Sequence, residues 1–172
     1  MQQKLRHTLK IPADRYIAVV TSPVYDEWAR KKLGLETRAE IERRETEDRI
    51  FRKVRMVRVV SERTRAWIKK DRLEMIDTTD IDKRSNTFTW EIVPGIWADR
   101  ITARAKGRIT PAGPDACVRE LDLELKVNVF LIGGRIEKAL SEKMDDYFVK
   151  VNAALEEFYR DEFQKKAASP VS

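Results

Sequence analysis

Residues 121–136 read LDLELKVNVFLIGGRI. Every second residue from Leu121 to Leu131 is apolar, and most of the positions between them are charged or amide side chains. This period of two predicts a strand with one buried face. The pair Gly133-Gly134 ends the alternation, and the pattern after it has the period of a helix. The stretch therefore predicts a strand that turns sharply into a helix.

The helix predicted after the glycine pair is long and amphipathic. Its apolar residues recur at spacings of three and four: Ile136, Leu140, Met144, Tyr147, Val151, Leu155 and Phe158. About thirty residues at about 1.5 Å each give a length of about 45 Å. The glycine pair fits a turn that needs positive φ or a close approach of the backbone. A phosphate-binding loop is the other interpretation, but no GxGxxG or P-loop pattern accompanies the pair.

The upstream chain predicts a strand, two short helices and then a series of strands. The strand covers 2–11, and the helices cover 13–20 and 22–32, the second ending at Gly34. The later strands fall within 42–60, 73–79, 87–93 and 101–109, with Trp67-Ile68 placed in the same strand-rich region. Antiparallel strands followed by one long helix predict an α+β fold in which a curved sheet wraps around that helix.

Composition sets limits on the chemistry. The chain has 172 residues, 35 Lys+Arg and 29 Asp+Glu, a net charge of +6, 42% apolar and 37% charged residues. We expect one domain over 1–166 with a frayed tail at 167–172. The absence of a signal peptide and of an apolar run of about 18 residues predicts a cytoplasmic protein. One cysteine and one histidine exclude an internal disulfide, a Cys/His zinc site and most catalytic triads.

Two stretches carry a resemblance to a known superfamily. They are Thr78–Lys83 with Thr87–Glu91, and Val127–Lys138 with its glycine pair. Together with the order of elements they resemble the helix-grip fold of the START and birch-pollen-allergen (SRPBCC) superfamily, above all bacterial START-like families of unassigned activity and lipid-transfer members. The resemblance implies a hydrophobic cavity between sheet and helix. Some members of the superfamily are aromatase/cyclases, and others transfer lipids or bind partners, so the fold alone does not determine the function.

The residues expected to line such a cavity come from the inward faces of the strands and the long helix. Small side chains on the sheet, such as Ala103 and Ala105, would leave room for a ligand, and aromatic and Met side chains would give adaptable walls. A fully packed core is the alternative interpretation. The predicted lining residues are Met56, Arg58, Phe88, Trp90, Trp97, Ala103, Ala105, Leu125, Val127, Leu140, Met144, Tyr147 and Val151.

The positive charge is concentrated in one segment. Residues 43–72 hold twelve Lys/Arg and five Asp/Glu, so the rest of the chain is close to neutral. Arg52 and Arg58 share the parity of the apolar residues in this strand, and an inward arginine would need an anion such as a ligand phosphate or carboxylate. The other interpretation is a solvated outer face of paired charges. No recognition helix or aromatic platform supports nucleic-acid binding.

Three functions remain open at this point. The first is a non-enzymatic domain that binds, or binds and transfers, a hydrophobic or lipid-like ligand, either neutral or anionic. The second is an interaction module whose basic face binds an acidic partner or an anionic membrane. The third is a cyclase- or hydrolase-like enzyme, which would need an ionisable pair in the cavity, such as Tyr147 with an inward Arg or Asp.

No cofactor or metal is expected. The spacing of Asp80, Asp82 and Glu91 imitates an EF-hand loop, but Ser85 stands where that loop needs glycine. His7 is interpreted as an exposed or capping residue of the first strand. Cys117 is interpreted as a small apolar filler at the start of a strand.

Overall fold

The computed structural model describes the backbone of residues 1–128 and 133–165. In this part of the chain an antiparallel sheet has the strand order β1-β7-β6-β5-β4-β3-β2. Its strands are β1 (Gln2–Leu9), β2 (Thr37–Glu45), β3 (Arg49–Val59), β4 (Arg72–Asp82), β5 (Thr87–Pro94), β6 (Ile101–Pro111) and β7 (Cys117–Val127). The helices are α1 (Ala13–Val20), α2 (Pro23–Lys32), α3 (Glu62–Ile68) and α4 (Gly133–Phe158), with a π-helical turn η1 (Tyr159–Phe163) after α4.

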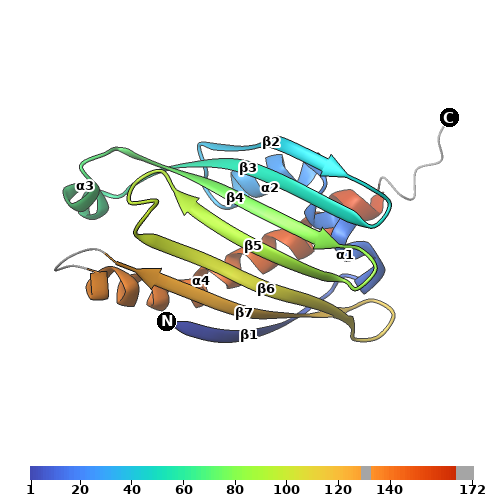
Figure 1. The fold of residues 1–172 in the computed structure, drawn as a ribbon. Coiled ribbons are helices and arrows are strands. Elements are labelled where there is room, and N and C mark those ends of the chain that lie inside the picture. The colour runs from blue at the N-terminus through green and yellow to red at the C-terminus, as the bar shows by residue number, and fades with distance from the viewer. Residues whose placement is uncertain (129–132, 166–172) are drawn as a thin grey trace.

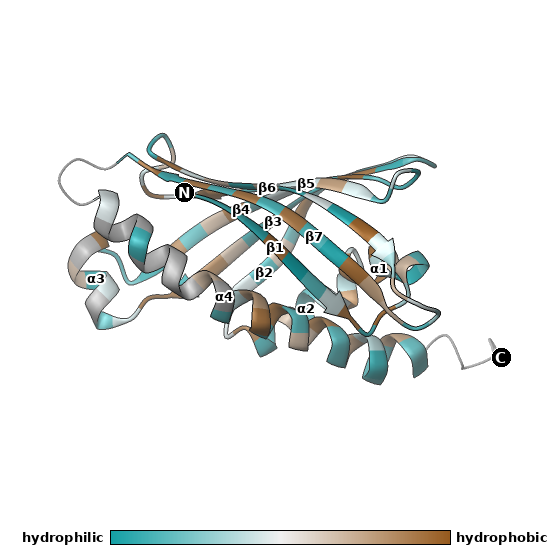
Figure 2. Ribbon diagram, turned by 90° about the horizontal axis from the view of Figure 1, so that it is seen from below, coloured by the Kyte–Doolittle hydropathy of each residue, from teal (hydrophilic) through white to brown (hydrophobic). Residues whose placement is uncertain are grey.

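The helices α1, α2 and α4 lie on one face of the sheet, and the other face is open (Figure 1). The view from below shows α4 running beneath the sheet with α1 and α2 near its C-terminal half (Figure 2). The α+β class, the two short helices after the first strand and the long C-terminal helix are thus confirmed. None of the helices in the described part is long and apolar enough to cross a membrane.

The prediction for residues around Trp67-Ile68 was wrong. These residues end the helix α3, which joins β3 to β4 at one end of the sheet (Figure 1). Ser61 caps this helix, its hydroxyl accepting a hydrogen bond from the backbone N–H of Thr64 at 3.3 Å. Lys69 then takes a left-handed conformation with φ of 53° and ends it. A side-chain cap and a left-handed stop define a short helix that has no clear apolar period of its own.

The turn from strand to helix depends on a close backbone approach. A Cβ on Gly133 would lie 2.7 Å from the carbonyl oxygen of Val127, so a larger residue would force the backbone apart. The predicted strand positions Val129 and Leu131 lie outside the described residues.

The inner face of the sheet is made of rows of side chains that cross the strands. One row runs Ile50, Ile81, Phe88, Gly107 and Leu121; the next runs Arg52, Thr79, Trp90, Ala105 and Leu123; a third runs Val54, Asp77, Ile92, Ala103 and Leu125. These rows are mainly apolar, as a sheet face packed on helices requires. The charged residues in these rows are Arg52 and Asp77, and both line a pocket under the sheet.

Candidate ligand-binding site

A pocket of about 140 Å³ lies between the inner face of the sheet, α1, α2 and the C-terminal half of α4. We call it the inner pocket. Most of its walls are aliphatic and aromatic side chains, including Ile17, Val54, Phe88 and Leu155. Its polar wall residues come from seven different elements and two connections: Tyr16, Thr21, Tyr25, Arg38, Arg52, Asp77, Thr79, Asn86, Arg119 and Tyr147.

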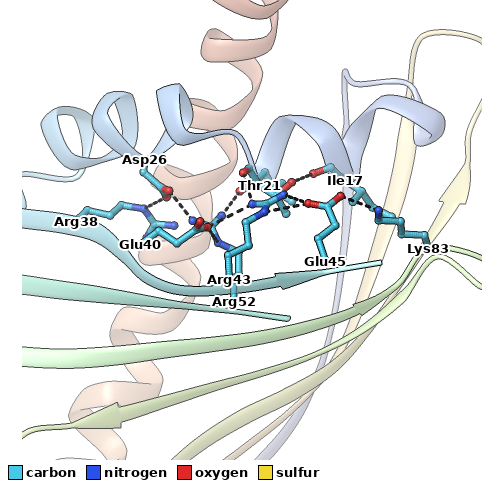
Figure 3. Close-up of polar contacts among 10 residues, drawn as sticks. Ile17, Thr21, Asp26, Arg38, Glu40, Arg43, Glu45, Arg52 and Lys83 are labelled. Atoms are coloured by element: carbon cyan, nitrogen blue, oxygen red, sulfur yellow. Dashed lines mark hydrogen bonds and ion pairs between the residues drawn. The ribbon is translucent and has the colours of Figure 1, made fainter. Parts of the chain in front are cut away.

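The corner between α1 and α2 is fastened to the sheet by arginines (Figure 3). Arg52 donates to the carbonyl oxygen of Val20 at 3.0 Å, and Arg43 donates to that of Thr21 at 3.1 Å. Both carbonyls belong to the C-terminal end of α1, where carbonyl groups lack partners within the helix and the helix dipole favours cations. The arginines therefore hold one wall of the inner pocket in place.

The Asp26 carboxylate links α2 to two strands, to β2 through Arg38 and to β3 through Arg52. It is 2.9 Å from Nε of Arg38 and 2.5 Å from an Nη of Arg52. Glu40 lies 2.9 Å from Nε of Arg52, but at an angle that leaves this N–H without a hydrogen bond. The sequence predicted that an inward arginine would need a ligand anion. For Arg52 that prediction was wrong, because the anion is supplied by Asp26 of the same chain (Figure 3).

Asp77 projects from the middle of β4 into the inner pocket. In register it stands between Val54 and Ile92, both apolar. It accepts hydrogen bonds from the Thr79 hydroxyl, at 3.1 Å, and from the Trp90 side chain. Burial raises the pKa of the Asp77 carboxyl, and the nearby Arg38 guanidinium opposes that rise only in part. The site thus holds a carboxyl group whose neutral form is favoured.

Tyr147 of α4 faces the same space from the opposite side. Burial raises the pKa of its phenol, and the negative charge of Asp77 raises it further. Arg38, Arg58 and Arg119 oppose this shift, so all three guanidinium groups act on the Tyr147 hydroxyl. An ionisable pair of the kind that the enzymatic hypothesis requires is therefore present.

The structure brings some of the predicted lining residues together and separates others. Phe88, Trp90, Tyr147 and Val151 line the inner pocket. Met56, Ala105, Leu125 and Val127 are buried, and Arg58, Trp97, Ala103 and Met144 are half-buried, without being among its wall residues. The side chain of Leu140 lies outside the described residues. Contact of any of these residues with a ligand stays a prediction.

Sequence reasoning missed Asp77, Arg119 and Arg38 as pocket residues. The signal was available for two of them, because Asp77 has the parity of Met75 and Ile81, and Arg119 has that of Cys117 and Leu121. A charged residue in an otherwise apolar parity marks a buried polar position. His7 was also misjudged: it is half-buried and faces inward, its ring 5.5 Å from that of Phe148.

The outer face of the sheet carries most of the remaining charge, in pairs. Arg49 lies 2.7 Å from Asp80, Arg55 lies 2.9 Å from Glu74, and Lys53 lies 2.9 Å from Glu42. A wide groove of about 990 Å³ on this face is lined mainly by such basic and acidic side chains in alternation. Exposed pairs of this kind neutralise one another, which fits the interpretation of a solvated outer face.

The comparisons with known proteins place the chain in a family. A family model described as "Protein of unknown function (DUF2505)" matches residues 4–158. The chain belongs to this family. No curated protein matches it.

Solved structures similar to this DUF2505 protein share its fold. A START superfamily protein from Mycobacterium smegmatis has a TM-score of 0.60 at 14% identity, with 91% of this chain and 98% of that one covered. The Zhui aromatase/cyclase from a Streptomyces species has a TM-score of 0.62 at 14% identity, covering 94% and 98%. Norcoclaurine synthase from Thalictrum flavum, in complex with dopamine and hydroxybenzaldehyde, has 0.62 at 15%, covering 94% and 88%. The START/SRPBCC helix-grip fold is confirmed.

The raised pKa of Asp77 predicts how the stability of this DUF2505 protein depends on pH. The folded chain binds the Asp77 proton more tightly than the unfolded chain does. The contribution of Asp77 to the free energy of unfolding is therefore fully present below about pH 4, and it is lost as the pH rises through the pKa of Asp77 in the folded chain. Asp77→Asn removes this loss. We expect the free energy of unfolding of the variant, relative to that of the original protein, to increase as the pH rises. The increase is about 1.4 kcal/mol for each tenfold difference in proton affinity between the folded and the unfolded chain.

Urea unfolding between about pH 4 and about pH 8 measures this difference. Asp82→Asn on the same strand is the matched control, because backbone N–H groups lower the pKa of Asp82, so that Asp82 titrates below this range and its substitution should have the same effect throughout it. A difference for Asp77→Asn that stays constant across this pH range would contradict a pKa shift at Asp77.

Proposed function

We propose that this protein binds a small hydrophobic molecule that carries a hydrogen-bonding group, and that the inner pocket holds it. The observation that carries the proposal is Asp77, a carboxyl group with hydrogen-bonding partners that lines that pocket and stands in register between the apolar residues Val54 and Ile92. Ligand sites in general combine apolar walls with a few polar groups that orient the ligand. A packed core gains nothing from such a residue, because burying a carboxyl group costs free energy.

The size of the inner pocket favours a ligand smaller than a membrane lipid. A cavity needs about 10–15 Å³ of volume for each water-sized group that it holds. The inner pocket, at about 140 Å³, therefore has room for on the order of ten non-hydrogen atoms. This supports a compact aromatic or medium-chain molecule. Transfer of a two-chain lipid would require the helices to move away from the sheet.

Native mass spectrometry of the protein purified from its own host tests the proposal. We expect a bound molecule at near-stoichiometric level, released by organic extraction and identified from its mass. A ligand-free mass that does not change after incubation with mixed lipid vesicles would contradict the proposal. That result would instead favour an interaction module, and the search would turn to acidic partners of the basic segment.

A substitution that fills the inner pocket should abolish this binding. The Phe88 ring lies directly over Gly107, and a Cβ on Gly107 would come within 2.1 Å of it. Because the sheet closes one side, Gly107→Ala drives the ring into the inner pocket, which Phe88 lines. We expect ligand affinity to fall at least about tenfold. The measurement is the fraction of protein that carries ligand in native mass spectra.

Gly134→Ala is the matched control, because a Cβ at that position has no atom within 4 Å. It should leave the bound fraction unchanged. Equal ligand occupancy in Gly107→Ala and the original protein, with both folded by circular dichroism, would place the ligand elsewhere.

Acid–base catalysis in the same pocket is a second candidate function. Asp77 and Tyr147 both face this space, and burial raises the pKa of each. A carboxyl group whose pKa is raised by burial can serve as a general acid. Returning the identified ligand to ligand-free protein distinguishes the two functions. A new product mass would favour an enzyme, and an unchanged ligand mass would favour binding alone.

A further inference from the structure

Arg119 is a buried cation in an apolar part of β7. It stands in register with Ile109 on one side and His7 on the other, and only 5% of its surface is exposed. Its neighbours of the same parity, Cys117 and Leu121, are buried apolar residues. Arg119 is one of the wall residues of the inner pocket.

The contacts of Arg119 are with neutral or aromatic groups. It donates to the Asn152 side-chain oxygen at 2.5 Å and to the Tyr16 hydroxyl at 3.3 Å, and it lies 3.5 Å from Nδ1 of His7. The Phe148 ring is 5.5 Å from its central carbon. Among the carboxylates whose contacts the structure describes, none forms an ion pair with it.

Arg52 shows how a buried guanidinium is neutralised in this fold. It has Asp26 and Glu40 as counter-ions, at 2.5 Å and 2.9 Å. Arg119 is buried to the same extent, and like Arg52 it has an Nε without a hydrogen bond in the described part of the chain, but it lacks the counter-ions that Arg52 has there. A buried charge without a counter-ion is costly, and the cost is relieved when an anion binds. Arg119 and Tyr16 are both wall residues of the inner pocket.

We propose that Arg119, with Tyr16, binds the carboxylate of a hydrophobic carboxylic acid in the inner pocket. This inference rests on the proposed function and names its ligand class. The guanidinium offers charge-assisted hydrogen bonds to a carboxylate, and the phenol adds a third donor. The apolar walls take the rest of the molecule. With room for on the order of ten non-hydrogen atoms, the inner pocket suits a medium-chain or aromatic acid.

Octanoate and octanol are the probes, because they share a chain and differ in the anionic group. Isothermal titration calorimetry measures the affinity of each for the original protein, Arg119→Met, Tyr16→Phe and Arg58→Met. We expect the original protein to bind octanoate at least about tenfold more tightly than octanol. Arg119→Met should remove that preference, because it weakens octanoate binding far more than octanol binding. Tyr16→Phe should reduce octanoate binding by a smaller factor.

Arg58→Met is the matched control. Its Nε is also buried without a hydrogen-bond partner in the described residues, but Arg58 is not among the walls of the inner pocket. It should keep the preference for octanoate. Methionine in place of an unpaired buried arginine is compatible with folding, since apolar residues often replace buried ions without loss of stability. Tyr16→Phe gives an independent answer if Arg119→Met does not fold.

The outcomes separate the two proposals. Octanol binding without any preference for octanoate would overturn the carboxylate site and leave the hydrophobic pocket in place. Loss of the preference in Arg58→Met but not in Arg119→Met would also overturn it. Binding of neither probe by the original protein would contradict the proposed function at this ligand size, and the carboxylate site with it.

Discussion

Asp26→Ala is expected to lower the free energy of unfolding by about 3–5 kcal/mol, because it leaves buried charges without their partner. The Asp26 carboxylate lies between the guanidinium groups of Arg38 and Arg52, and all three side chains are at least 88% buried (Figure 3). Removing it leaves the two cations next to each other, Arg38 without this ion pair and Arg52 with Glu40 as its remaining counter-ion. The same substitution also releases α2 from β2 and β3, so the wall of the inner pocket is lost with the stability.

Chemical denaturation of the purified variant measures the effect, and two further variants show its cause. Glu27→Ala removes the next acidic residue of α2, which is exposed and pairs with Arg30 on the same helix, and should change little. The triple variant Asp26→Leu, Arg38→Met, Arg52→Met removes the whole buried cluster. Because it leaves neither guanidinium buried without Asp26, it should recover much of the stability that Asp26→Ala loses.

A loss for Asp26→Ala no larger than that for Glu27→Ala would contradict this account. A triple variant less stable than Asp26→Ala would also contradict it. The contacts of the cluster would then contribute more to stability than the pairing of its charges explains. In that case other polar contacts would also position α1 and α2, such as the hydrogen bond from Arg43 to the Thr21 carbonyl.

The elements that could be predicted from the sequence are those with a local period. The alternation around Leu121–Val127 and the helical spacing from Met144 to Phe158 each use neighbours within a few residues, and both became the expected elements. The helix bounds at Ala13–Val20 and at Lys32 also follow local signals, Pro12 before the first helix and Gly34 after the second, with φ of 63° at Gly34.

The polar interior could not be predicted in the same way, because its partners are distant in the chain. Asp26 meets Arg52 from 26 positions away, and Arg119 meets Asn152 from 33. Parity alone indicates that a residue such as Asp77 faces inward, but not which side chains face it. That depends on the register of β4 with β3 and β5, and on the position of α4 over the sheet.

The position of α4 depends on Phe158, and Phe158→Ala is expected to cost about 3–5 kcal/mol. The Phe158 side chain is 2% exposed, and its ring centre lies 5.4 Å from that of Tyr25 and 6.1 Å from that of Trp28, both on α2. Phe163 of η1 packs against it at 6.4 Å. Alanine leaves a cavity that these three rings cannot fill, because two of them are held on α2 and the third on η1.

Val149→Ala is the control on the same helix, since its side chain is 66% exposed and should change stability by no more than about 0.5 kcal/mol. Phe158→Leu refills most of the space and should cost about 1.5 kcal/mol or less. The midpoints of urea unfolding rank the three variants. A Phe158→Ala midpoint equal to that of Val149→Ala would mean that α4 is held by other contacts.

The ligand readout gives a second test of the same cluster. Val151 and Leu155 line the inner pocket from the turns of α4 just before Phe158. If Phe158 holds this part of α4 against α2, Phe158→Ala should weaken octanoate and octanol binding together, because the wall itself moves. Arg119→Met should weaken octanoate binding far more than octanol binding, because only the anion loses its counter-ion. The two variants therefore separate the shape of the inner pocket from its charge.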